Sequence, residues 1–86
     1  METSSEWMEK HGIDPKHLTL WANIVLGWAG ETGWQPSSWE RAFLRLASVS
    51  DYSNQMILLD SWPEAMTAFI CWKEGDLTEL RRWAEQ

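Results

Sequence analysis

Residues Leu18–Ala29 place apolar side chains around most of the helix that their spacing predicts. At about 100° per residue the apolar arc covers roughly 240°, and only Thr19, Asn23 and Gly27 form a polar strip. A surface helix of a small domain needs an apolar arc of little more than ~100°. We therefore expect this helix to be covered on several sides, either as the central helix of the fold or by a partner as well.

Start and stop signals divide the rest of the chain into short helices. Capping boxes, in which a side-chain oxygen and a Glu three residues later satisfy free backbone N–H groups, begin at Thr3, Ser37, Ser61 and Asp76. Asp14 followed by Pro15 is another start signal, and Gly12, Gly30 and Gly75 are natural stops. The signals predict helices over residues 4–11, 15–29, 37–48, 62–74 and 77–85, and a weaker pattern favours a short helix between residues 50 and 60.

Helical periodicity assigns an inward face to each of these segments. The stripe of the 37–48 helix is Trp39, Ala42, Phe43 and Leu46, with Arg41 and Arg45 outward. Tyr52, Met56 and Leu59 point inward from the next helix, and Trp62, Ala65, Met66, Phe69 and Trp72 from the one after it. Leu77, Leu80, Trp83 and Ala84 complete the predicted interior, while Cys71 lies opposite the core stripe of its helix.

The predicted fold class is all-α. Five to six short helices joined by loops of a few residues, with no alternating β pattern, indicate a compact orthogonal or bundle-like arrangement. At 86 residues the chain has the length of one domain, so we expect residues 1–86 to form a single helical domain.

Charge and composition exclude several classes of partner. Thirteen acidic residues against seven basic ones give a net charge of −6, which argues against nucleic acid because phosphate contacts need clustered Lys and Arg. The apolar run of residues 18–29 would rise only ~18 Å as a helix, short of the ~30 Å hydrocarbon core, so we expect no membrane span. A single cysteine and the lack of a signal-like start favour a cytoplasmic location.

The sequence offers no pattern for catalysis. His11, His17 and Cys71 lack metal-ligand spacing, and no glycine-rich phosphate loop follows a predicted strand. Cys71 has no cation one helical turn away to lower the pKa of its thiol, so a nucleophilic role is not expected. We therefore predict a protein that is not an enzyme and that has no catalytic residue, metal or cofactor.

The chain carries more apolar bulk than so small a core needs, including eight tryptophans. The side chains left at or near the surface after the predicted core is filled are Trp7, Leu20, Trp34, Leu44, Ile57, Leu58 and Trp62. Exposed apolar area beyond a few hundred Å² usually marks an interaction site. Trp7, Trp34 and Trp62 are the predicted protein-binding anchors, with Leu20 and Ile57 as their apolar surround.

These features predict a small acidic module that binds another protein and blocks or modulates it, as an inhibitor, antiactivator, immunity protein or adaptor does. Such proteins are common among bacterial and phage accessory genes, and the acidic rim would favour a basic partner surface. One alternative is a homodimer that uses the same surplus apolar surface. Another is a helix-turn-helix DNA-binding regulator, in which Arg41 and Arg45 face DNA. No motif in the chain identifies a family.

Overall fold

The computed structural model describes the backbone of residues 4–86 and the side chains of residues 6–86, and in this range it contains six helices and no strand. The helices are α1 (Ser4–His11), α2 (Pro15–Trp28), α3 (Ser38–Val49), α4 (Tyr52–Ser61), α5 (Pro63–Lys73) and α6 (Leu77–Ala84). This confirms the all-α prediction. The capping box predicted at Thr3 lies outside the described residues.

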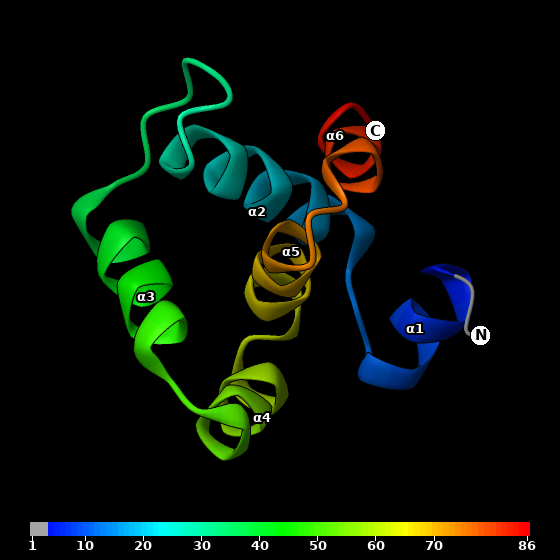
Figure 1. The fold of residues 1–86 in the computed structure, drawn as a ribbon. Helices are drawn as coiled ribbons and strands as arrows, with labels where there is room; N and C mark the ends of the chain where they lie inside the picture. The colour runs from blue at the N-terminus through cyan, green and yellow to red at the C-terminus, as the bar shows by residue number, and fades with distance from the viewer. Residues whose placement is uncertain (1–3) are drawn as a thin grey trace.

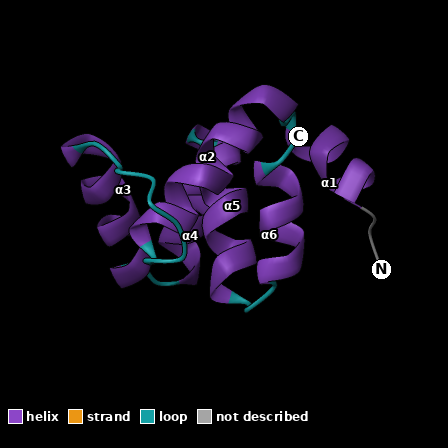
Figure 2. Cartoon of the chain, turned by 90° about the horizontal axis from the view of Figure 1, so that it is seen from above, coloured by secondary structure: helices purple, strands orange, loops and turns teal. Residues whose placement is uncertain are grey.

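Helix α5 runs through the middle of the molecule (Figure 1). It packs against α2, α3, α4 and α6, and α2 also packs against α6 and α3. Helix α3 lies at one edge, and α1 and α6 lie towards the opposite edge (Figures 1 and 2). None of the described helices is both long and apolar enough to cross a membrane.

Helix α2 is covered on several sides, as its wide apolar arc predicted. Leu18, Ala22 and Val25 are buried along one face, and Ile24 and Leu26 are buried on either side of it. Its polar strip also has a structural use, because Asn23 Nδ2 donates hydrogen bonds to the carbonyls of Thr19 and Ala84, at 3.0 and 3.1 Å. The second bond ties α2 to the end of α6.

Local capping explains most of the helix boundaries. Ser37 and Glu40 form both hydrogen bonds of the predicted capping box at the start of α3. The carboxylates of Asp14 and Asp76 accept backbone N–H groups at the starts of α2 and α6. Gly12, Gly30 and Gly75 follow their helices with positive φ angles, the conformation in which glycine commonly ends a helix.

The capping box predicted at Ser61 is wrong, because Ser61 is the last residue of α4. Trp62 is at once the C-cap of α4 and the N-cap of α5, with φ −135° and ψ 70° and no side-chain cap. Pro63 then begins α5, where its missing N–H leaves one fewer backbone donor to satisfy. The two helices therefore meet without a loop, and the Trp62 ring projects from the corner between them.

The inward faces predicted for α3 and α4 are partly wrong. Leu44 and Leu58, expected near the surface, are buried, whereas Leu46 and Tyr52, expected in the core, are 51% and 76% exposed. Apolar side chains occupy more than half the circumference of α3, so periodicity alone does not choose the half that packs. Because α3 lies at an edge, only the half with Phe43, Leu44 and Ala47 is buried.

Cys71 is buried, contrary to the prediction that it lies opposite the core. Every residue from Ala65 to Phe69 is also buried, so α5 has no solvent-facing side over this stretch. The reason is the central position of α5, which has neighbouring helices on several sides.

Candidate protein-binding surface

Four aromatic rings from different parts of the chain meet where α2, α3 and the corner between α4 and α5 come together. We call them the aromatic cluster: Trp21, Trp39, Phe43 and Trp62. Phe43 is the ring common to all the others, with centroid distances of 5.4 Å to Trp21, 5.9 Å to Trp39 and 5.6 Å to Trp62. Trp39 also lies 6.3 Å from Trp21 and 6.4 Å from Trp62. These distances fall within the range at which aromatic pairs attract each other.

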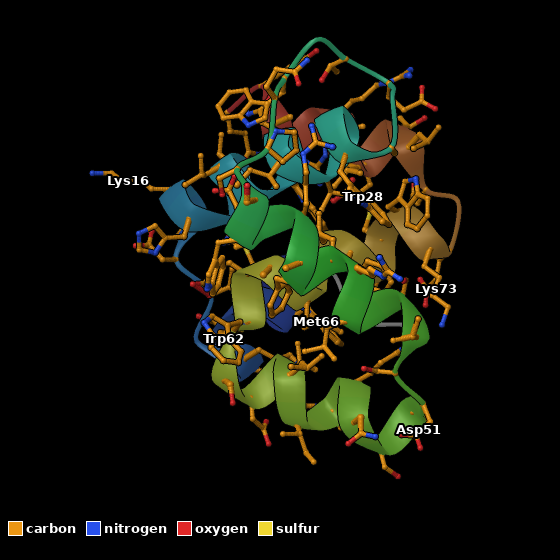
Figure 3. The ribbon with its side chains drawn as sticks, turned by 90° about the vertical axis from the view of Figure 1, so that its left-hand side faces the viewer. Lys16, Trp28, Asp51, Trp62, Met66 and Lys73 are labelled. Atoms are coloured by element: carbon orange, nitrogen blue, oxygen red, sulfur yellow. The ribbon has the colours of Figure 1, made fainter. Side chains whose placement is uncertain are left out.

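The aromatic cluster has a buried base and an exposed top. Phe43 is buried, whereas Trp39 is 57% exposed and Trp62 is 44% exposed. The Trp39 ring stacks on Phe43 with an interplanar angle of 14°, and the Trp62 ring meets Phe43 edge-on at 69°. Trp62 lies beside α3, as its ring contacts with Trp39 and Phe43 show (Figure 3). Two large indoles are therefore held by neighbouring rings and still contact water.

Exposed apolar side chains continue along α3 beyond the aromatic cluster. Trp39, Ala42, Leu46 and Val49 are all exposed, and their spacing places them on one side of the helix. We call these four residues the outer face of α3. The same helix buries Leu44 on its other side. Helix α3 therefore uses one half of its apolar arc for the fold and leaves the other half in solvent.

The predicted anchors are Trp7, Trp34 and Trp62, and together with their predicted apolar surround, Leu20 and Ile57, they come from different segments of the fold. Trp62 belongs to the aromatic cluster, while Leu20, Trp34 and Ile57 are exposed on α2, on the loop before α3 and on α4. No ring contact joins Trp34 to another aromatic residue within the described part of the chain.

Trp7 has a different position from that expected of an anchor. It is only partly exposed and packs against the hydrophobic core. Its Nε1 donates a hydrogen bond of 3.0 Å to Thr67 Oγ1 on α5, and its ring lies 4.0 Å from that of His11. Because both its ring and its N–H face the protein, Trp7 attaches α1 to the rest of the fold.

Trp39 is the exposed tryptophan that the helical periodicity missed. Periodicity predicts that residues 39, 42, 43 and 46 face the core, but only Phe43 is buried, and Trp39, Ala42 and Leu46 are exposed. The signal that could have found Trp39 is the width of the apolar arc, which also includes Leu44 and Ala47. An arc that wide means that part of it stays outside unless neighbours surround the helix.

Charged side chains of both signs lie beside the aromatic cluster and the outer face of α3. On one side His17 Nδ1 lies 3.5 Å from Asp14 Oδ2 and 3.7 Å from Glu64 Oε1. His17 is one turn before Trp21, and Glu64 is two residues after Trp62, so this group lies near the aromatic cluster. Arg45 lies on α3, along the edge of the outer face.

Cys71 is the one cysteine of the chain, and its surroundings suppress the reactivity of its thiol. Burial and the carboxylates of Asp76, Glu79 and Glu74 raise the pKa of the Cys71 thiol to about 12, and its Sγ lies 3.3 Å from the Asp76 carbonyl oxygen. A thiol with so high a pKa is almost wholly protonated near neutral pH and is a weak nucleophile. Within residues 6–86, no three His, Cys, Asp or Glu side chains group closely enough to hold a metal ion.

Comparisons of this chain with protein-family models, with curated proteins and with solved structures find no match. The features that call for a functional explanation are the two exposed indoles of the aromatic cluster and the outer face of α3, because folding does not account for their exposure.

Proposed function

We propose that this protein is a small acidic binding module without catalytic activity, and that it blocks or modulates a partner protein by covering part of its surface. The observation that carries the proposal is the pair of exposed indoles, Trp39 and Trp62, packed against the buried Phe43. The outer face of α3 extends the apolar area next to them.

The geometry of the aromatic cluster suits an interface anchor. Tryptophan is enriched among the residues that contribute most to protein binding. Binding also costs free energy when mobile side chains become ordered, at about 0.5–1.5 kcal/mol for each rotamer-rich side chain. Trp39 and Trp62 already contact neighbouring rings in the free protein, so less of this cost remains to be met on binding.

The local charges favour a partner surface that is not simply basic. The net charge of −6 steers the whole protein towards positive surfaces at long range. At the proposed surface itself Arg45 lies on α3 beside exposed apolar residues. We therefore propose contacts to carboxylates at this edge.

Two observations support a protein partner over DNA. The segment between α2 and α3 runs from Ala29 to Ser37, longer than the three- or four-residue turn of a helix-turn-helix. The Arg41 side chain also donates hydrogen bonds to the Pro36 carbonyl and to Gln35 Oε1, at 3.2 and 3.4 Å. Because these groups of the protein already engage its guanidinium, Arg41 is less suited to contact a DNA phosphate.

The test is affinity purification of the tagged protein from its native cells, compared with Trp39→Ala and Trp62→Ala. We expect both variants to lose the same co-purifying protein, because removing a central aromatic anchor typically costs ~2 kcal/mol or more, about 30-fold in affinity. Trp34→Ala is the matched control, since Trp34 is 41% exposed but lies outside the aromatic cluster.

Circular dichroism should show that all three variants remain folded at the temperature of the experiment. If the Trp39 and Trp62 variants recover the same proteins as the unmodified chain, the aromatic cluster is not the binding surface.

A further inference from the structure

We infer that the outer face of α3 receives an amphipathic helix of the partner protein, whose apolar seam is flanked by a carboxylate that pairs with Arg45. The inference rests on the proposed function and specifies the kind of partner. It is carried by the spacing of the exposed residues, by the lack of a covering element among the described residues and by the charge along one edge.

The four residues of the outer face follow the spacing of a helix-pairing seam. Trp39, Ala42, Leu46 and Val49 are separated by three, four and three positions, the 3-4-3 pattern of apolar positions in coiled coils. At 1.5 Å per residue the seam is about 15 Å long. It matches about three turns of a partner helix, which would place its own apolar residues at the same spacing.

No described element covers this seam. Leu46 is 51% exposed and Val49 is 75% exposed. Figure 3 looks at α3 from outside the molecule, with no other helix drawn in front of it. Two exposed aliphatic residues and a large exposed indole in one line form a continuous apolar strip, the type of surface on which another helix packs.

Arg45 provides the charge that specifies the partner. It comes one residue before Leu46, so it flanks the seam at the position where helix pairs form interhelical ion pairs. The Arg45 side chain is exposed, and no described residue accepts a hydrogen bond from it or forms an ion pair with it. Among the acids near α3, the Glu40 side chain is used in the capping box and that of Asp51 caps α4. Arg45 is thus available to an external carboxylate.

A second copy of the chain fits this seam less well. The positions that flank the seam on α3 are Ser38, Phe43, Arg45 and Ser50. None carries a carboxylate, so a second α3 paired in either direction offers Arg45 no acidic partner.

The net charge of −6 does not prevent an acidic helix from binding. The Debye length is about 8 Å at physiological ionic strength, so distant acidic groups are largely screened and charges close to Arg45 have the greater effect. We therefore expect binding of an acidic-flanked helix to be measurable at physiological salt.

The experiment uses two synthetic helical peptides of 16 residues and the full-length protein. Both peptides carry leucines at alternating three- and four-residue spacing, and they differ only in having Glu or Lys at the flanking positions. Backbone amide NMR spectra locate the bound peptide, and fluorescence anisotropy of labelled peptides gives the affinity. We expect the Glu peptide to shift amide resonances of residues 38–50 and to bind more tightly than the Lys peptide.

Two variants and two matched controls test the residues involved. Leu46→Ala should weaken binding of the Glu peptide about tenfold, because it removes a central apolar contact. Arg45→Glu should weaken the Glu peptide about fivefold and strengthen the Lys peptide, because the charge at the edge is reversed. Ile57→Ala and Lys73→Glu make the same kinds of change at exposed positions outside α3 and should leave both affinities unchanged.

Three results would overturn the inference. One is that the Glu peptide does not bind, or shifts resonances of other helices instead of α3. Another is that the two peptides bind equally and Arg45→Glu changes neither affinity. A third is that sedimentation shows a dimer of the free protein that Leu46→Ala dissociates, because then a second copy covers the seam.

The failure of this inference can be told apart from failure of the proposed function. Trp62 belongs to the aromatic cluster but not to the seam, so affinity purification with Trp62→Ala tests the aromatic cluster without removing a residue of the seam. If Trp62→Ala loses the natural partner but Leu46→Ala and Arg45→Glu keep it, the partner binds the aromatic cluster without a helix on α3. If all three variants keep the partner, the proposed function fails as well.

Discussion

The backbone of Trp34 lies directly against Gly27 of α2. A Cβ added at Gly27 would come within 2.7 Å of Trp34 Cβ and 2.8 Å of the Trp34 carbonyl carbon. The loop before α3 is therefore held against α2 through a position that tolerates only glycine. Pro36, two residues further on, is buried. Together these contacts fix where α3 begins and therefore where the outer face of α3 and the aromatic cluster lie.

Gly27→Ala should destabilise the protein by about 1–3 kcal/mol, because the new methyl group meets backbone atoms that cannot move without shifting the loop. The gain in helix propensity from glycine to alanine, up to about 1 kcal/mol, acts in the opposite direction and should be outweighed. Urea unfolding measures the difference. Gly33→Ala is the control, because a Cβ there meets nothing within 4 Å. Equal stability of the two variants would show that the loop is not held in this way.

Leu44→Ala and Leu46→Ala should have very different effects on stability, although they are the same change on the same helix. Leu44 is fully buried, so its truncation leaves a cavity and should cost about 2–5 kcal/mol. Leu46 is half exposed, and its truncation should cost less than about 1 kcal/mol. Thermal and urea unfolding of the pair test which side of α3 packs inward. The reverse order would mean that α3 is rotated about its axis.

The hydrogen bond between Trp7 and Thr67 should couple α1 to α5. Thr67→Val leaves the indole N–H without its acceptor and should cost about 1–3 kcal/mol. In a double-mutant cycle with Trp7→Phe, the two losses should be non-additive by about 1 kcal/mol, because either change removes the same bond. Thr78→Val, at an exposed position of α6, is the control. Additive losses would mean that the bond contributes no coupling.

Stability should fall with rising pH above about 9 because of Cys71. Burial and nearby carboxylates raise the pKa of its thiol from an ordinary 9.0 to about 12 in the folded state. Between these values the unfolded chain has released the proton and the folded chain has kept it. The free energy of unfolding therefore decreases by at most about 1.4 kcal/mol per pH unit.

Urea unfolding between pH 8 and 11 measures this slope, with Cys71→Ala as the control for other titrating groups. The free energy of unfolding of Cys71→Ala should decrease less steeply with rising pH than that of the unmodified protein. Identical pH profiles for the two proteins would show that the thiol ionises equally in both states.

The chain by itself determined the helices and most of their ends. Ser37 with Glu40 and Asp14 with Pro15 are local signals, because the groups that they satisfy lie within a few residues along the backbone. The wide apolar arc of α2 likewise predicted its coverage on several sides, and the surplus of apolar side chains predicted that some large ones stay exposed.

The tertiary structure alone decided which apolar residues those are. Trp39 and Leu44 belong to the same apolar arc, and periodicity does not separate them; they differ because the rest of the fold lies on only one side of α3. Cys71 is buried for the converse reason, since helices surround α5 on several sides. Which part of an arc is buried depends on the positions of elements distant in sequence, and no local pattern encodes those positions.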